Sequence, residues 1–318
     1  MPDYFLGLDG GGTKTSAALA DETGRVVCTH VGDSINYYSE GLEQARQNFA
    51  KILSDIKNKS GVPEIHSVFI GSSALFGKAN GQELAAFTAG VCDAPYVTMD
   101  SDLAIALEGM MQKGECGVVI SGTGSMAAGR RADGTIFSKG GYGYILGDEG
   151  SGYKIGLAGI QKAVTAFEGA TEKTLLTGAL QKKYQVNDLH DLTHIFYDPP
   201  IERKAIADFA KQVFDCAHAG DSAASAIIKS AARELAATAA ALLREFEKPV
   251  PLGVFGGIFM HHAIYFDAFC KELQRLVANV SVCRLPLVPV LGAVLGAMKA
   301  AGKKITEEIK QNIMKAEI

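Results

Sequence analysis

Apolar residues in the first third of the chain occur in short runs that alternate with longer amphipathic segments. Short apolar runs are typical of strands, whereas apolar positions spaced three and four apart are typical of helices. The predicted elements are strands over 4–8, 14–20 and 26–31, a helix over 42–59, a strand over 68–71, a helix over 82–91, a strand over 96–99 and a helix over 102–111. Three successive strands followed by strands that alternate with helices predict an α/β domain.

The same opening returns after residue 115. The predicted elements are strands over 117–120, 125–130 and 136–138, a largely helical stretch over 153–247, a strand over 252–257, a helix from about 261, a strand over 280–284, and helices over 292–301 and 306–316. This repeat predicts two α/β domains, 1–114 and 115–302, the second with a helical insertion. We expect the last helix, within 303–318, to pack back on the first domain and complete it.

Length and charge narrow the class of protein. The chain has 318 residues, which exceeds the size at which one core usually keeps growing, so two domains are expected. Hydrophobic residues make up 47% of the chain, enough for two substantial cores. The formal net charge is −4 and no basic run is longer than a pair, so nucleic acid is not an expected partner.

Membrane and export signals are not evident in the sequence. The longest apolar stretch, 285–298, is interrupted by Pro286, Pro289, Gly292 and Gly296 and is shorter than a membrane span. No basic segment precedes the first predicted strand, so a signal peptide is not expected. The six cysteines form no Cys-x-x-Cys pair, which favours reduced thiols. These features predict a cytoplasmic protein that does not contact the membrane.

Two glycine-rich turns stand at equivalent places in the two halves. The segment 5–15 reads Phe-Leu-Gly-Leu-Asp-Gly-Gly-Gly-Thr-Lys-Thr, and 118–125 reads Val-Val-Ile-Ser-Gly-Thr-Gly-Ser. Without Cβ atoms, such backbone can approach an anion and point its N–H groups at phosphate oxygens. Hydroxyl groups of Thr13, Thr15 and Thr123 lie beside the glycines. Either turn alone is equally consistent with an ordinary hairpin, but the repetition predicts one nucleotide held between two related domains.

A carboxylate follows the last predicted strand of the first domain. Asp100 stands at the carboxyl end of that strand, where open α/β sheets bind ligands. A general base needs only to reach the hydroxyl that it deprotonates. The alternative role is helix capping, which suits both Asp100 and Asp102. We assign the base to Asp100 and the cap to Asp102.

Five motifs occur in a characteristic order along nearly the whole chain. They are Asp9-Gly-Gly-Gly-Thr13, Ser121-Gly-Thr-Gly-Ser125, Gly140-Gly-Tyr-Gly143, Gly147-Asp-Glu-Gly-Ser151 and Gly256-Gly257. Together they resemble the actin-like ATPase and sugar kinase superfamily, within it the BadF/BadG-type ATPase family and, most closely, N-acetylglucosamine kinases. The resemblance implies two ribonuclease-H-like domains with ATP in the cleft between them and the sugar deeper in that cleft.

The resemblance also implies roles for individual residues. Asp9 would hold Mg²⁺ through water, and Asp100 would activate the nucleophile. The implied nucleotide-binding residues are Asp9, Gly11, Gly12, Thr13, Lys14, Thr15, Gly122, Thr123, Gly124, Gly256 and Gly257. The implied sugar contacts are Asn36, Ser73, Thr123, Gly141, Tyr142 and Asp148. For Asn36 and Tyr142 the alternative is a polar loop residue without a ligand. Tyr142 stands where the kinases that the chain resembles most carry Trp.

The implied reaction is transfer of the ATP γ-phosphoryl group to the 6-hydroxyl of an N-acetylhexosamine. N-acetylglucosamine is the first candidate, and N-acetylmuramic acid, glucosamine and N-acetylmannosamine stay open; a homodimer is expected. An alternative is an ATP-hydrolysing activator of a dehydratase, which holds an iron–sulfur cluster through cysteines. Cys116 lies in a predicted strand and Cys216 is far from it in sequence, which disfavours this alternative.

Overall fold

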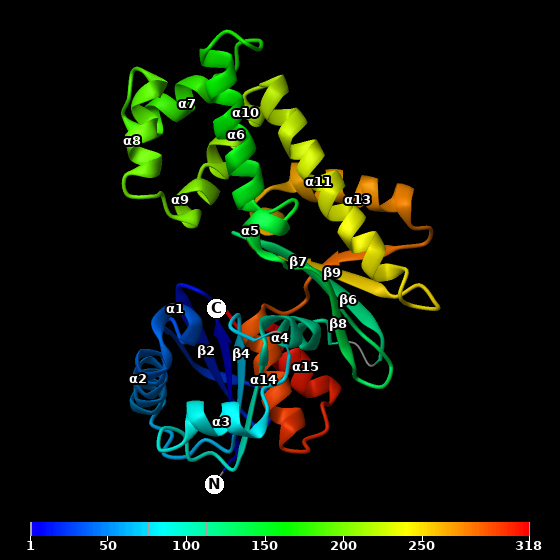
Figure 1. Cartoon of the computed structure of the whole chain (residues 1–318). Helices are drawn as coiled ribbons and strands as arrows, with labels where there is room; N and C mark the ends of the chain where they lie inside the picture. The colour runs from blue at the N-terminus through cyan, green and yellow to red at the C-terminus, as the bar shows by residue number, and fades with distance from the viewer. Residues whose placement is uncertain (1, 76, 112–113, 318) are drawn as a thin grey trace. The chain divides into compact units, whose positions relative to one another are not determined.

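The computed structural model describes residues 2–75, 77–111 and 114–317. The chain forms two compact units, each built around one five-stranded sheet (Figure 1). The first unit consists of the described parts of 1–116, 132–136 and 285–318, and the second consists of 117–131 and 137–284. The chain therefore leaves the first unit and returns to it near its end.

The first sheet has the strand order β3-β2-β1-β4-β5. Its strands are β1 (Tyr4–Gly10), β2 (Lys14–Asp21), β3 (Val26–Asp33), β4 (Ser67–Ser72) and β5 (Tyr96–Ser101). β1, β2 and β3 are antiparallel, whereas β4 pairs parallel to β1 and β5 parallel to β4. Because β1, β4 and β5 run the same way, the ends of β1, β4 and β5 lie along one edge of the sheet.

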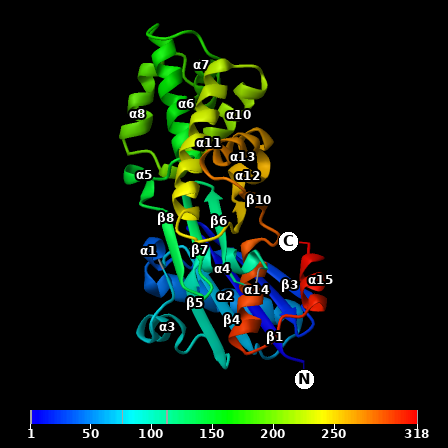
Figure 2. The same ribbon diagram turned by 90° about the vertical axis from the view of Figure 1, so that its right-hand side faces the viewer.

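Helices cover both faces of this sheet. They are α1 (Tyr37–Glu40), α2 (Leu42–Ser60), α3 (Gly81–Thr88), α4 (Asp102–Gly109), α14 (Pro289–Ala300) and α15 (Glu307–Met314). On one face, Leu6 and Leu8 of β1 pack with Phe49 and Ile52 of α2. The opposite face packs against α14 and α15, as Figure 2 shows for α14 in front of β1 and β4.

Helix α14 lies in the first unit, although its residues were predicted as part of the second domain, which was expected to extend to residue 302. The reason is a close approach that only glycine permits. A Cβ on Gly7 of β1 would lie 2.6 Å from the carbonyl oxygen of Val290, and one on Gly292 would overlap the carbonyl oxygen of Ile105. This backbone contact leaves α14 packed directly on β1 and α4.

The second sheet repeats the topology of the first, with the order β10-β9-β6-β7-β8. Its strands are β6 (Cys116–Ser121), β7 (Ser125–Arg130), β8 (Ile136–Gly140), β9 (Pro251–Phe255) and β10 (Ser281–Arg284). Read from β8 to β10, this order matches β3 to β5 strand by strand. β6 and β9 are parallel, as are β9 and β10. The predicted α/β class and the repeated opening are therefore confirmed.

The predicted helical stretch is confirmed, but it is divided into shorter helices. These and the flanking helices are α5 (Gly143–Leu146), α6 (Gly152–Phe167), α7 (Leu175–Tyr184), the 3-10 helix η1 (Leu189–Asp191), α8 (Leu192–Tyr197), α9 (Arg203–Ala207), α10 (Ala210–His218), α11 (Ser222–Leu243), α12 (Gly257–His261) and α13 (Ala263–Leu276). Within the described residues, no helix combines the length and apolar character needed to cross a membrane.

Candidate functional site

The turn between β1 and β2 exposes backbone at its tip. A 3.0 Å hydrogen bond from the Gly11 N–H to the Lys14 carbonyl closes the turn. Gly10 must be small, because a Cβ there would lie 2.7 Å from Ile35 Cγ1. Gly12 is exposed, and a Cβ at Gly12 would meet no atom within 4 Å. An anion can therefore approach this backbone closely.

The threonines on either side of Lys14 differ in accessibility. Thr13 is exposed beside Gly12, whereas Thr15 is fully buried in β2. The Thr15 hydroxyl donates to the Asp33 carbonyl at 2.9 Å and accepts from the Ile35 N–H at 3.2 Å. The prediction that Thr15 contacts phosphate is wrong, because this buried hydroxyl is used on both sides to fasten β2 to the segment after β3.

Two predicted sugar contacts, 37 positions apart in sequence, meet beside this turn. Asn36 Nδ2 donates to Ser73 Oγ at 3.1 Å, and the Ser73 N–H donates to the Gly10 carbonyl at 2.9 Å. Asn36 Oδ1 also caps α1, since it accepts from the N–H groups of Tyr38 and Ser39. Within the described residues, the second Asn36 Nδ2 hydrogen and the Ser73 hydroxyl hydrogen have no partner, so both can bind a ligand.

Two carboxylates lie close together at the same edge of the first sheet. Asp9 is near the end of β1, and Asp102 is the first residue of α4. Burial and the Asp102 carboxylate raise the pKa of Asp9 to about 7, against the opposing effect of Lys14. Burial also raises the pKa of Asp102. Two partly buried negative charges repel each other, so this pair favours a shared proton or a bound cation.

Asp100 has different surroundings. It lies on β5 in register with Gly71 of β4, which is itself in register with Asp9. The side chain of Ile105 fills the space above Gly71 and so lies between Asp9 and Asp100. Asp100 Oδ1 accepts the Ser101 N–H at 2.6 Å. Burial raises the pKa of Asp100, against these hydrogen bonds from Ser101.

The predicted cap of α4 at Asp102 is wrong. The N-cap is Ser101, whose Oγ accepts the Ala104 N–H at 3.3 Å. A serine hydroxyl satisfies this N–H directly, so Asp102 takes the first helical position instead. A carboxylate is favoured there by the helix dipole.

The turn between β6 and β7 in the second unit resembles the first turn. Its carbonyl groups are bound to the start of α6: Gly122 accepts from the Gly152 N–H at 2.7 Å, and Thr123 accepts from the Tyr153 N–H at 3.2 Å. A Cβ on Gly122 would meet no atom within 4 Å, and Thr123 is exposed. The tip of this turn is therefore also backbone that an anion can approach.

The predicted adenosine-side turn lies next to this phosphate turn. Gly256 has φ 97°, and a Cβ there would overlap the Ser121 carbonyl, which immediately precedes the turn. Only glycine fits this position. Gly257 begins α12, and a Cβ on Gly257 would lie 3.9 Å from His261, its nearest neighbour.

The remaining predicted sugar contacts lie on the segment between β8 and α6. Gly141 has φ 77°, and a Cβ there would lie 2.6 Å from Met126 Sδ. Tyr142 is 75% exposed. Asp148 is buried with φ 64°, and its Oδ1 accepts the Ser125 N–H at 3.3 Å. Met126 and Ser125 follow the glycine turn directly, so these residues gather beside that turn in the second unit.

One residue of this group has no signal in the sequence. Arg203, at the start of α9, forms an ion pair with Asp148 although it lies 55 positions away in sequence. It belongs to no motif and stands within the helical insertion. Only the folding of α9 onto the second sheet's loop region brings the guanidinium to Asp148.

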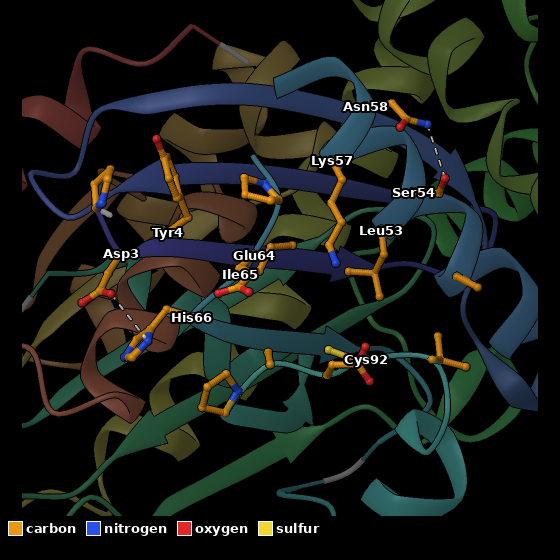
Figure 3. A pocket seen from close by; sticks show the side chains of 17 residues that line it. Asp3, Tyr4, Leu53, Ser54, Lys57, Asn58, Glu64, Ile65, His66 and Cys92 are labelled. Atoms are coloured by element: carbon orange, nitrogen blue, oxygen red, sulfur yellow. Dashed lines mark hydrogen bonds and ion pairs between the residues drawn. The ribbon is translucent and has the colours of Figure 1, made fainter. Parts of the chain in front are cut away.

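Figure 3 shows a cavity, of about 940 Å³, that is lined by other residues. It is lined by residues that precede or begin β1, β4 and β5, among them Asp3, Tyr4, His66 and Pro95, and by Lys57 of α2. Those strand starts are at the opposite edge of the first sheet from Asp9 and Asp100. The cavity therefore contains none of the predicted site residues.

Comparison with known proteins finds relatives along nearly the whole chain. An N-acetylmuramic acid/N-acetylglucosamine kinase from Clostridium acetobutylicum is 29% identical over 297 residues, which cover 92% of this chain and 97% of the relative. An N-acetyl-D-glucosamine kinase from Dictyostelium discoideum is 27% identical over 316 residues, covering 94% and 98% of the two chains.

Solved structures share the fold. A Chromobacterium violaceum protein named as a candidate N-acetylglucosamine kinase superposes with a TM-score of 0.75 at 24% identity, covering 92% of this chain and 98% of the other. A ROK family hexokinase from Thermus thermophilus superposes with a TM-score of 0.62 at 17% identity, covering 94% and 100%. The profile of one family matches residues 6–300, from β1 to the end of α14, and so includes both glycine turns and both sheets. The chain belongs to the BadF/BadG/BcrA/BcrD ATPase family.

Proposed function

We propose that the protein is an ATP-dependent kinase that phosphorylates the 6-hydroxyl of an N-acetylhexosamine. N-acetylglucosamine is the first candidate, and N-acetylmuramic acid and glucosamine are the next. Two observations support this: each sheet carries an exposed glycine turn beside polar side chains, and relatives spanning over nine-tenths of the chain are named as kinases of these amino sugars. The observation that carries the proposal is the pair of matching turns, because backbone N–H groups suit phosphate.

ATP is the phosphoryl donor in this proposal. Its phosphates bind the exposed backbone of 11–13 in the first unit and of 122–124 in the second. Thr13 and Lys14 supply a hydroxyl and a positive charge at the first turn. The turn at Gly256 and Gly257 lies beside the second phosphate turn and receives the adenosine side.

We propose Asp102 as the general base, in place of Asp100. Asp102 is near enough to Asp9 to raise its pKa, and Asp9 adjoins the phosphate turn, whereas Ile105 separates Asp100 from Asp9. In the reaction, the sugar 6-hydroxyl attacks the γ-phosphorus, its proton passes to the Asp102 carboxylate, and the bond from phosphorus to ADP breaks. A base with a raised pKa accepts such a proton readily at neutral pH.

The carboxylate pair fits Mg²⁺. Hard oxygen ligands suit this ion, and a divalent cation would relieve the repulsion between Asp9 and Asp102. Among the described residues, no group of three or more His, Cys, Asp or Glu side chains could hold a metal ion by itself. Mg²⁺ would therefore bind Asp9 through water together with the nucleotide phosphates, and it would neutralise charge on those phosphates.

The sugar binds Asn36 and Ser73 in the first unit, and Thr123, Gly141, Tyr142 and Asp148 in the second. Asn36 and Ser73 are already oriented by their mutual hydrogen bond. Asp148 accepts hydrogen bonds from sugar hydroxyls, and the Tyr142 ring covers an apolar sugar face. We also propose a cytoplasmic homodimer, on the resemblance alone; light scattering of the purified protein tests the dimer.

A coupled assay of ADP release tests the function. The panel contains N-acetylglucosamine, N-acetylmuramic acid, N-acetylmannosamine, glucosamine and glucose, each at saturating ATP and Mg²⁺. We expect sugar-dependent ADP release, with ³¹P NMR placing the phosphate on the 6-oxygen. If the rate of ATP hydrolysis is the same with and without each sugar, the proposal is overturned, and the result fits an ATP-driven activator instead.

A further inference from the structure

An ion pair with a buried carboxylate joins the helical insertion to the segment beside the second phosphate turn. Arg203 Nη2 donates to Asp148 Oδ2 at 2.6 Å. The Asp148 side chain is only 5% exposed, whereas Arg203 is 38% exposed. The guanidinium also lies 5.5 Å above the ring of Tyr144, a cation–π contact. A buried carboxylate needs such a partner, because without it the charge would be neither solvated nor compensated.

The orientation of the guanidinium is set by Asp148. Arg203 Nε is buried, and within the described part of the chain it has no hydrogen-bond partner. Arginine has five N–H donors, so one donor is left unsatisfied while another is committed to Asp148 at short distance. The orientation of the Arg203 side chain therefore satisfies the Asp148 carboxylate, whereas the Arg203 Nε–H is not satisfied among the described residues.

The backbone holds Arg203 in this place. Helix α9 lies against α6 where Gly156 has no side chain; a Cβ on Gly156 would overlap the Ile206 carbonyl. The guanidinium in turn lies on Gly124, since a Cβ there would lie 2.5 Å from Arg203 Nη2 and 3.0 Å from Asp148 Oδ2. A side chain at position 124 would therefore collide with the ion pair in its present position.

We propose that Arg203 is a positioning residue, which fixes the Asp148 carboxylate for binding the hydroxyls of the amino sugar. This inference rests on the proposed function. Asp148 Oδ2 faces Arg203 and Oδ1 faces the Ser125 N–H, so both oxygens are oriented and each keeps a lone pair for a sugar hydroxyl. Arg203 acts through Asp148 and does not itself contact the reacting atoms.

The other role open to Arg203 is direct attraction of the ATP phosphates, since it adjoins Gly124. The two roles make opposite predictions about Michaelis constants. A residue that orients Asp148 affects the KM for sugar, whereas a residue that binds phosphate affects the KM for ATP. The short bond to Asp148 favours the first role.

The test compares Arg203→Met and Arg203→Lys with wild type in the ADP-release assay. Arg131→Met is the matched control, because Arg131 also forms an ion pair, with Glu245 at 3.5 Å, and lies 4.5 Å above the ring of Phe137. We expect Arg203→Met to raise the sugar KM about 10- to 100-fold, the range seen when the partner that orients a metal ligand is removed. The ATP KM should change less than about threefold, and Arg203→Lys should recover part of the loss because it restores the positive charge.

Each outcome decides between the alternatives. A folded Arg203→Met protein with an unchanged sugar KM, or with a raised ATP KM instead, overturns the inference. If Arg203→Met does not fold, Arg203→Lys decides by the same comparison of the two Michaelis constants. A wild-type protein that phosphorylates no sugar overturns the proposed function and the inference with it, whereas an active wild type with an unaffected variant overturns the inference alone.

Discussion

The two carboxylates at the end of β5 face different surroundings, although Ser101 alone separates them in sequence. Asp100 is bound to the Ser101 N–H at 2.6 Å, whereas Asp102 lies near Asp9. We expect Asp102→Asn to lower kcat by about 10²–10⁴, because the amide cannot accept the hydroxyl proton. The KM values should stay nearly constant, since the amide keeps the shape of the carboxylate. Steady-state kinetics of the purified variant measure both parameters.

Asp100→Asn is the matched control for this prediction. It changes a buried carboxylate of the same segment, and we expect its kcat to fall much less than that of Asp102→Asn. If Asp100→Asn proves the more damaging substitution, the base is Asp100, as the sequence pattern suggested.

The two turn glycines with open space beside them, Gly12 and Gly122, provide a second prediction at this scale. Gly12→Val and Gly122→Val should fold normally, because a Cβ at either position meets no atom within 4 Å. Each should raise the ATP KM about tenfold or more, equal to about 1.4 kcal/mol of lost binding, because the side chain keeps phosphate from the backbone. Gly77→Val, at an equally open position that belongs to neither turn, is the control. An unchanged ATP KM for folded Gly122→Val would make that turn purely structural.

At the scale of elements, the close packing of α14 against α4 makes Gly292 indispensable. A Cβ there would overlap the Ile105 carbonyl oxygen, which is backbone and cannot move aside. We expect Gly292→Ala to lower the free energy of unfolding by about 3 kcal/mol or more. Urea denaturation measures the change.

The matched control is Gly178→Ala in α7, where a Cβ meets no atom within 4 Å. Here alanine should raise the free energy of unfolding by about 0.5–1 kcal/mol, because it favours the helix. The same substitution thus has opposite effects at the two sites. Equal effects would show that the packing of α14 is looser than described.

The cap of α11 links two helices of the insertion. Asp221 accepts the Ala224 N–H at 2.8 Å as N-cap, and it also accepts the Leu175 N–H at 2.7 Å and the Thr174 hydroxyl at 2.8 Å. Burial acts to raise the pKa of Asp221, but these hydrogen bonds outweigh burial and lower it overall. Asp221→Ala should lower the free energy of unfolding by about 1–3 kcal/mol at pH 7.

The pH dependence of this loss follows from the sign of the shift. The pKa of Asp221 is lower in the folded state, so its stabilisation is complete above the unfolded value of about 3.9 and disappears as the pH falls through the folded value. The difference in the free energy of unfolding between wild type and Asp221→Ala should therefore become smaller below pH 4. Urea denaturation at several pH values measures it. Asp188→Ala, at the exposed cap of η1, is the control and should cost less. If this difference in the free energy of unfolding does not change with pH, the ionised form of Asp221 is not what stabilises the cap of α11.

At the scale of the whole molecule, the first unit is discontinuous in sequence. Its strands lie within the first 101 residues, but the helix α14 that covers one face of its sheet follows residue 288. Buried apolar side chains such as Val290, Val294 and Met298 each contribute about 1.5–3 kcal/mol. A fragment that ends at residue 116 should therefore fail to fold.

Joining the two parts should restore folding. The Leu287 N–H donates to the Gly109 carbonyl at 3.3 Å, so a short glycine-serine linker can replace the second unit between residues 111 and 286. We expect this joined fragment to unfold cooperatively in urea, unlike 1–116 alone. Cooperative unfolding of 1–116 would mean that α14 contributes little to the first unit.

The sequence alone determined the local features of this protein. Apolar runs and glycine turns predicted the strands, the α/β class and the repeat, because strand period and turn geometry depend on neighbouring residues. The same motifs predicted the two glycine turns, which have open tips at Gly12 and Gly122; phosphate binding at these turns stays a prediction.

Tertiary structure decided the features that depend on contacts between distant residues. Apolar periodicity predicted α14 as a helix but did not show which sheet it covers. Close backbone contacts at Gly7 and Gly292 place α14 on the first sheet. The same holds for the buried hydroxyl of Thr15 and for Arg203, whose partner Asp148 stands 55 positions away. Strands, helices and turns depend on residues that are close in sequence, so the sequence predicts them. Contacts between distant residues depend on which elements pack together, and the sequence pattern does not contain that information.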